Sequence, residues 1–260
     1  MLTTVITPVL NGARTIERTL RSVAVQRGDF EHIVMDGGST DGTAEIVERY
    51  QSIYPVRVVR QPDRSLYEGV WNGMQLSRGE ILCYLNADDL HLPWTLATVA
   101  SVFANRPEVH WLTGIPSWQR DDTGVTTTCG YAPVFLQSLI RRGWYSSARL
   151  GFMQQESMFW RRALWERAAP QDILLKYRLG GDFHLWRRFA TFTRLHTVAA
   201  TLACFVISPN QASRAGLTKY LAECGIAGGS ATAPPAGRAF HRLLSHLLFR
   251  RVIVPPVHAV

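Results

Sequence analysis

Short β-rich runs alternate with helical periods through the first hundred residues, and this alternation constrains the fold more than any other feature. The β-rich runs centre on Val5–Thr7, His32–Met35, Val56–Val59 and Ile81–Leu85. Between them, apolar residues recur at helical spacing, as in Ile16, Leu20 and Val23. Strands alternating with helices over short loops predict an α/β fold, with a mostly parallel, Rossmann-like sheet flanked by helices.

The alternation weakens beyond residue 110. Strand-like pieces are expected near Ser157–Trp160 and Leu202–Ile207, and helices near Arg161–Arg167 and Phe183–Thr191. A stretch rich in Gly, Ala and Pro, residues 225–237, is typical of a linker. We therefore expect one domain over residues 1–224, a linker over 225–237, and a C-terminal appendage over 238–260.

Composition excludes several classes of protein. The 260 residues are 47% apolar, enough for a core that needs no disulfide or metal to fold. The four cysteines never form a Cys-x-x-Cys pair, so a zinc knuckle is not supported. No nucleic-acid-binding signature is present, and we expect no nucleic-acid partner. The chain starts without a basic segment before its apolar run, and no apolar run reaches about 20 residues, so a cytoplasmic protein is expected.

Charge is divided unevenly along the chain. Residues 1–140 carry 11 Lys/Arg against 15 Asp/Glu, a net charge of −4, whereas residues 141–260 carry 17 against 5, a net charge of +12. A basic surface attracts nucleic acid, anionic lipid or an acidic substrate. Since nucleic acid is not expected, the second half is predicted to face lipid or substrate.

Two carboxylates, Asp88 and Asp89, follow the apolar run Ile81–Leu85 directly. Ligands of parallel sheets bind at the carboxyl ends of the strands, where this Asn86-Ala87-Asp88-Asp89 segment would lie. Mg²⁺ and Mn²⁺ bind one or two carboxylates and complete their shell with water and substrate phosphates. The alternative is that one of these acids caps the helix near Pro93 or stabilises a turn.

The loop Asp36–Thr43 contains three glycines, at positions 37, 38 and 42. Glycine lets the backbone approach a ligand closely, and the hydroxyls of Ser39 and Thr40 can donate to an anion or a ribose. The alternative is a strand-to-helix turn capped by Asp41. Neither a Gly-x-Gly-x-x-Gly nor a P-loop sequence is present.

Taken in order, these segments resemble the inverting glycosyltransferases of family 2, which have the GT-A fold. The resemblance covers about residues 3–215. It includes the strand and loop 5–12, the glycine loop 34–43, the segment 61–81, the acidic motif 85–89, and later the runs 154–162 and 180–188.

The resemblance implies roles for seven residues. Thr7, Val9, Asp36 and Arg64 would line the nucleotide of a sugar-nucleotide donor. Asp88 would be the main ligand of Mn²⁺ or Mg²⁺, and Asp89 a secondary ligand or a group behind it. Asp182 would be the catalytic base that takes the proton of the acceptor hydroxyl. The alternative for Asp182 is an N-cap of the helix from Phe183.

The chain departs from the family pattern at two positions that bear on the donor site. Gly37 stands where a second acid is common, and Asn86 where the first acid of Asp-x-Asp is common. The resemblance still implies a metal-dependent inverting transferase that uses a UDP-sugar and acts on a glycan or lipid-linked acceptor in surface polysaccharide biosynthesis. The departures motivate one alternative, a non-catalytic nucleotide-sugar or glycan-binding module. A nucleotidyltransferase with a related sheet is a further alternative, disfavoured because the glycine loop lacks the basic residues expected of it.

The tail has the pattern of a basic amphipathic helix. Phe240, Leu243, Leu244, Leu247 and Leu248 fall on one helical face, with Arg238, Arg242 and Arg250 mostly opposite. Such a helix can lie in a membrane interface, here at the inner face of the cell membrane. Packing of the same apolar face on the domain or on a partner subunit is the alternative.

Overall fold

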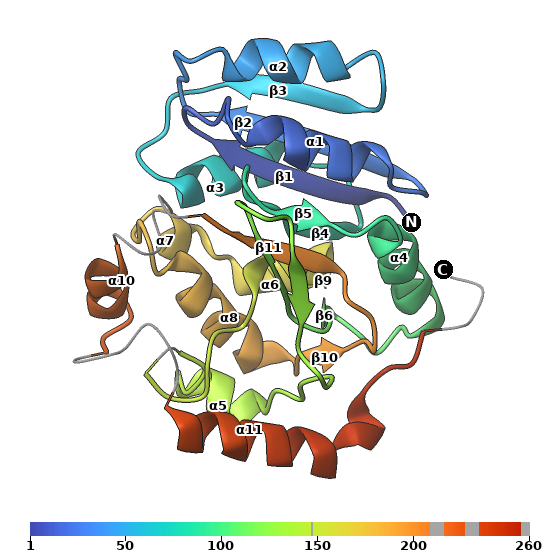
Figure 1. The fold of residues 1–260 in the computed structure, drawn as a ribbon, viewed down its shortest axis with the longest axis vertical. Coiled ribbons are helices and arrows are strands. Elements are labelled where there is room, and N and C mark those ends of the chain that lie inside the picture. Colours follow the sequence, from blue (N-terminus) through green and yellow to red (C-terminus); the bar gives the residue numbers. More distant parts are fainter. Residues whose placement is uncertain (147, 209–215, 227–233, 256–260) are drawn as a thin grey trace.

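Two sheets form the body of the protein (Figure 1). The computed structural model describes residues 1–146, 148–208, 216–226 and 234–255. Within these residues the larger sheet has seven strands in the order β10-β6-β9-β4-β1-β2-β3, and the smaller has four in the order β5-β11-β7-β8.

The first half of the large sheet is parallel, as the alternation predicts. Its strands are β1 (Thr3–Val9), β2 (Phe30–Asp36), β3 (Val56–Arg60) and β4 (Ile81–Tyr84). The helices between them are α1 (Ile16–Ala24), α2 (Thr43–Tyr50) and α3 (Leu66–Leu76). The expected α/β fold with a mostly parallel sheet is confirmed.

The second half of the large sheet contains β6 (Trp111–Thr113), β9 (Phe159–Arg161) and β10 (His196–Thr197). Strand β9 lies antiparallel between β4 and β6, which makes the sheet mixed. Buried tryptophans fill this region, with the rings of Trp160 and Trp186 edge to face at 5.8 Å. Aromatic pairs of this kind stabilise the core beyond their buried area.

The small sheet was not predicted from the sequence. It consists of β5 (Leu90–His91), β7 (Ser117–Arg120), β8 (Thr126–Thr128) and β11 (Ala203–Ile207). Strand β5 follows Asp89 directly and pairs with β11. The acidic motif therefore lies at the junction of the two sheets.

Helices cover both faces of the large sheet. Side chains alternate across a strand, so Ile6 of β1 packs with α3 and α8 (Gly181–Phe192), whereas Val5 packs with α1 and α4 (Thr95–Asn105). The helix expected to open at Pro93 begins two residues later, at Thr95. The other helical segments are α5 (Gln137–Arg141), η1 (Gln155–Ser157), α6 (Arg162–Ala168), α7 (Gln171–Leu174) and α10 (Leu217–Glu223).

The C-terminal helix α11 (Pro235–Leu247) begins three residues before 238, the expected start of the C-terminal appendage. Residues 227–233 of that linker and the last five of the tail, 256–260, lie outside the described residues. After η2 (Phe249–Arg251), the chain joins the body through a parallel bridge between Val198 and Ile253. Among the described residues, no helix has both the length and the apolar character that crossing a bilayer requires.

Gly79, between α3 and β4, gives a test of this packing. A Cβ there would lie 2.5 Å from the main-chain nitrogen of Thr4, and backbone cannot move aside as a side chain can. We expect Gly79→Ala to lower the free energy of unfolding by roughly 2 kcal/mol, measured by urea denaturation. The matched control is Gly130→Ala, where no atom lies within 4 Å. Equal stability of the two variants would contradict the packing described here.

Candidate active site

Two loops meet beyond the carboxyl ends of β1 and β2. The Asn11 main-chain N–H donates to the Ser39 hydroxyl at 2.8 Å, and that of Gly12 donates to the Thr43 hydroxyl at 2.9 Å. Asp41 accepts from the Ala13 N–H at 2.9 Å and from its neighbour Thr43. Asp41 therefore acts as a turn-stabilising residue, and the two loops form one surface at the edge of the sheet.

Asp36 ends β2 beneath this surface and is buried. Its Oδ1 accepts the N–H of Ser39 at 2.8 Å and that of Gly38 at 3.2 Å. Its Oδ2 is also buried and has no hydrogen-bond partner within the described parts of the chain. A buried carboxylate oxygen without a partner is costly, and a donor group of a ligand could satisfy it.

The other three residues expected at the nucleotide are placed differently. The Thr7 hydroxyl is buried and bonds to His32 Nε2 at 2.8 Å, and the Val9 side chain packs in the core. These placements leave only the main chains of Thr7 and Val9 for a ligand. The Arg64 side chain is exposed and bonds to Glu68 at 2.8 Å. Their roles at the nucleotide stay predictions.

Asp63 is a site residue for which the sequence analysis assigned no role. A Cβ on Gly37 or on Gly69 would lie 2.9 Å from its Oδ2, so its carboxyl group occupies the space beside both glycines. Burial raises its pKa, with further contributions from Glu68 and Asp36. Gly37 lacks the second acid common in the family, and Asp63 brings a carboxyl group from another loop to that place. The sequence feature that could have pointed to Asp63 is Gly37 itself, because a glycine leaves room for a side chain from another loop.

Asp88 and Asp89 form the turn between β4 and β5. Asp89 is buried, and its Oδ1 accepts the Val206 N–H of β11 at 2.9 Å. Burial, together with Glu156 and Asp88, raises the pKa of Asp89 well above its ordinary value. Helix α4 begins six residues further on, without a side-chain cap, so neither acid caps it. Asp89 thus holds the turn against β11, and Asp88 is only partly buried.

The donor set around Asp88 suits a cation that substrate helps to bind. Among the described residues, no three His, Cys, Asp or Glu side chains come together as a self-sufficient metal site. The carboxamide Oδ1 of Asn86 is buried and has no hydrogen-bond partner in these parts of the chain. One carboxylate and one amide oxygen fit Mg²⁺ or Mn²⁺ completed by phosphate oxygens and water.

Glu156 lies in η1, almost completely buried. Its Oε1 has no hydrogen-bond partner in the described residues. Burial, with smaller contributions from the charges of Asp88 and Asp182, raises its pKa to about 8. The neighbouring Gln155 donates to the Tyr84 carbonyl at 2.5 Å, so η1 lies against the end of β4, the strand that leads into the Asp88 turn. The sequence contains no local signal for the placement of Glu156, because it lies in an irregular segment.

Asp182 lies in the first turn of α8, and the preceding Gly180 is the N-cap position. The pKa of Asp182 is raised to about 6. Burial raises it, and hydrogen bonds from the Phe183 N–H at 2.7 Å and the Tyr67 hydroxyl at 3.2 Å offset part of this rise. The Tyr67 ring packs directly under Gly181, where a Cβ would approach it to 2.7 Å. The base predicted from the sequence is therefore held by α3, the helix that follows the Arg64 loop.

The segment before α8 is fixed by Glu223 of α10. The Glu223 carboxylate accepts main-chain N–H groups of Leu179 at 2.9 Å and Gly180 at 2.8 Å. A carboxylate at a helix N-terminus satisfies unpaired N–H groups and interacts favourably with the helix dipole. His184 stacks on Tyr177 at 4.0 Å and bonds to the Glu223 carbonyl at 2.9 Å, which gives it a structural role.

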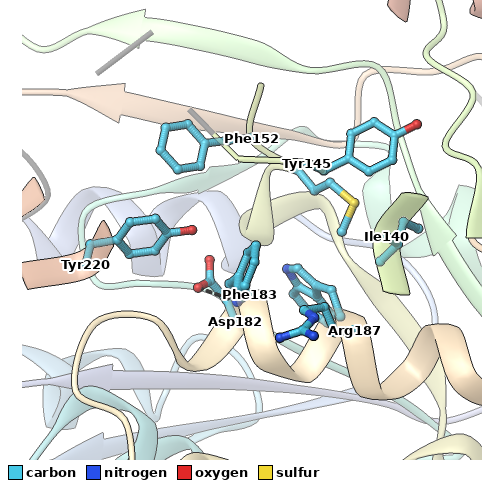
Figure 2. Close-up of a pocket in the computed structure, with 9 residues that line it drawn as sticks. Ile140, Tyr145, Phe152, Asp182, Phe183, Arg187 and Tyr220 are labelled. Carbon is cyan, nitrogen blue, oxygen red and sulfur yellow. Dashed lines mark hydrogen bonds between the residues drawn. The ribbon is translucent and has the colours of Figure 1, made fainter. Parts of the chain in front are cut away.

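A pocket lined mainly by apolar and aromatic side chains opens beside Asp182 (Figure 2). Figure 2 shows Tyr220 and Phe152 near the carboxyl group, with Ile140 further along the pocket. Apart from Asp182, the lining residues are Ile140, Tyr145, Phe152, Met153, Phe183, Trp186, Arg187 and Tyr220. A carboxylate at the end of such a pocket can remove a proton from a hydroxyl carried by an apolar group.

Comparison with known proteins agrees with this fold. The chain resembles the crystal structure of S. aureus TarS 1–349 in complex with UDP-GlcNAc, with a TM-score of 0.63 and 19% identity over 81% of this chain and 60% of that chain. It also resembles the mannosyltransferase PcManGT from Pyrobaculum calidifontis in complex with GDP-Man and Mn²⁺, with a TM-score of 0.60 and 22% identity over 94% of this chain and 69% of that one. The chain therefore has the GT-A fold of glycosyltransferases.

Sequence comparison identifies the family. Residues 4–166 match the model of glycosyl transferase family 2. A PGL/p-HBAD biosynthesis glycosyltransferase of Mycobacterium bovis is 30% identical over 209 residues, which cover 76% of this chain and 75% of that protein. The chain belongs to glycosyl transferase family 2 and is a glycosyltransferase.

The burial of Glu156 predicts a pH-dependent stability. A carboxyl group whose pKa is raised from 4.5 to about 8 on folding stabilises the folded state at low pH, and this contribution is lost as the pH rises through that range. Glu156→Gln keeps the side chain neutral at every pH. We expect its free energy of unfolding, measured in urea from pH 5 to pH 8, to decline less than that of the wild type. Parallel declines would contradict the raised pKa.

Proposed function

We propose that this glycosyltransferase is metal-dependent and inverting, and that it transfers a sugar from a UDP-sugar to a hydroxyl of a glycan or lipid-linked acceptor in surface polysaccharide biosynthesis. The observation that carries the proposal is the placement of two acids: Asp88 is in the turn at the carboxyl end of β4, and Asp182 lines the pocket at the start of α8. Binding of the donor at Asp88 and of the acceptor at Asp182 would bring the reacting atoms together.

The donor would bind over the joined loops at the ends of β1 and β2. The unpartnered Oδ2 of Asp36 and the carboxyl group of Asp63 are the acceptors available there for donor groups of a base or ribose. The complexes of TarS with UDP-GlcNAc and with UDP support a uridine nucleotide. The complex of PcManGT with GDP-Man makes a guanosine nucleotide the competing choice.

Asp88, assisted by Asn86, would hold the cation, and Asp89 would keep their turn in place against β11. Bound there, Mn²⁺ or Mg²⁺ would stabilise the charge that develops on the departing diphosphate. The presence of Mn²⁺ in the PcManGT complex supports this proposal.

Asp182 would supply the base. Its pKa of about 6 leaves it ionised at neutral pH while still basic enough to accept a proton in the transition state. As the acceptor oxygen attacks the anomeric carbon, the bond from that carbon to the diphosphate oxygen breaks and the hydroxyl proton passes to Asp182. Attack opposite the leaving group inverts the configuration. The Tyr67 hydroxyl and the Phe183 N–H hold the carboxylate in place.

The apolar pocket beside Asp182 favours an acceptor whose hydroxyl adjoins an apolar or aromatic group, because aromatic side chains recognise such groups by stacking and burial. A lipid-linked acceptor has this chemistry and would be met at the inner face of the cell membrane.

Asparagine substitutions test the two acids separately. We expect Asp182→Asn to lower kcat by roughly a hundredfold to ten-thousandfold while donor binding is retained, because only proton transfer is lost. Asp88→Asn should instead abolish the stabilisation by UDP-sugar that depends on Mn²⁺ in thermal-shift assays, and a panel of UDP- and GDP-sugars would define the donor. The control is Asp122→Asn, an exposed acid paired with Arg120. Full transfer activity in both site variants would refute the proposal.

The rate of transfer should rise with pH through about 6 and level off above it, because Asp182 acts in its ionised form. Tyr67→Phe removes a hydrogen bond that lowers the pKa of Asp182, so the midpoint should move to higher pH. Profiles of kcat/KM against pH measure this shift. Tyr177→Phe, on the ring that stacks on His184, is the control. An unmoved midpoint in Tyr67→Phe would exclude Asp182 as the group that titrates.

A further inference from the structure

Helix α11 packs on the body through small and polar side chains. The Ser245 hydroxyl accepts the Val134 N–H at 3.0 Å, and His241 Nε2 lies 3.2 Å from the Val134 carbonyl oxygen. Gly237 lies so close to the Arg149 carbonyl that a Cβ there would approach it to 2.0 Å. These contacts, spaced at four residues along the helix, fix its rotation about its own axis.

The fixed rotation leaves the large apolar residues of α11 in solvent. Phe240, Leu243 and Leu247 are 52%, 59% and 74% exposed, at spacings of three and four residues along one helical face. Beyond the helix, Phe249 and Val254 are also exposed, at 55% and 69%. The predicted apolar face is therefore divided: its edge at Leu248 packs on the body, as the packing alternative expects, whereas Phe240, Leu243 and Leu247 do not. Contiguous exposed apolar surface on a helix is typical of an interaction site.

Positive charge surrounds the apolar face. Arg242, Arg250 and Arg251 are exposed, and none of them forms an ion pair with an Asp or Glu in the described part of the chain. Arg251 also lines a hollow together with Arg194. The first turn of α11 contains no acidic residue, and residues 141–260 as a whole carry a net charge of +12. The partner of this surface must therefore be both apolar and anionic.

We propose that α11 is a membrane-docking helix whose Phe240–Leu243–Leu247 face enters the interface of an anionic bilayer while its arginines contact lipid phosphates. An amphipathic basic helix lies in this way with its apolar side at the acyl boundary. A second copy of the chain would fit the apolar face, but it would bring two basic clusters together, which costs free energy.

The position of α11 connects docking to the proposed reaction. His241, on the side of α11 that faces the body, packs against the Tyr145 ring at 5.2 Å, and Tyr145 lines the pocket beside Asp182. Figure 1 shows α11 at the end of the molecule opposite α2 and β3. The docked helix would thus hold the acceptor pocket near the bilayer. The placement of the acceptor pocket near the bilayer rests on the proposed function, whereas the docking of α11 on a membrane does not.

Vesicle co-sedimentation tests the docking. The full chain should bind vesicles of phosphatidylcholine with about one-third phosphatidylglycerol, and bind pure phosphatidylcholine at least roughly tenfold more weakly. The triple variant Phe240→Ser, Leu243→Ser, Leu247→Ser should lose roughly a hundredfold in affinity for the anionic vesicles. About 0.5 M NaCl should weaken wild-type binding, because the arginine contacts are screened.

The control variant is Val25→Ser, Ile53→Ser, Val125→Ser, which removes exposed apolar residues elsewhere on the surface and should bind vesicles like the wild type. Wild-type affinity in the α11 variant, or a wild-type dimer in light scattering that the α11 variant makes monomeric, would overturn the proposal. Thermal shift by UDP and Mn²⁺ without vesicles, measured on all three proteins, tests donor binding independently. A protein that binds vesicles but not nucleotide would refute the proposed function and leave the docking intact.

Discussion

The hydrogen bond from the Val206 N–H to the Asp89 carboxylate joins the two sheets at the point on which the site depends. It ties the turn after β4 to β11, and the Thr19 hydroxyl of α1 donates to the Asp89 carbonyl at 2.9 Å from the other side. Because Asp89 is buried and committed to these contacts, its neighbour Asp88 is presented at a fixed place with a partly exposed side chain. One acid of the pair organises the backbone so that the other can meet a ligand.

A second contact connects the two substrate sides of the site. Tyr67 belongs to α3, which begins after the Ser65 cap, and its hydroxyl lies 2.8 Å from the Leu179 carbonyl as well as near Asp182. Its ring fills the space that a side chain at position 181 would need. Glycine at 181 is therefore required by packing rather than by backbone conformation. Tyr67 therefore joins α3 to the start of α8 and to Asp182.

The sequence predicts well what depends on local periodicity. Strands β1 and β4 are recovered because they are short, β-rich runs that are buried throughout, and helices such as α1 because each buries one regular stripe. The small sheet was missed because β5 has two residues and β8, Thr126–Thr128, is fully exposed, so neither has an apolar pattern. Asp63 and Glu156 were not assigned roles because their positions follow from space left by distant glycines and from burial. Such properties belong to the tertiary structure.

The tail also shows what the sequence does not determine. Its periodicity predicts an amphipathic helix but leaves open which face the body receives, since both alternatives require the same apolar stripe. The contacts decide it: Gly237, His241 and Ser245 fit closely against the body, whereas leucine or phenylalanine at these positions would hold the helix away. A helix that packs on the body through these residues leaves Phe240, Leu243 and Leu247 exposed, and only Leu248 of the predicted apolar face packs on the body. Because Tyr145 contacts His241 of the tail and also lines the pocket beside Asp182, the tail packs against one wall of that pocket.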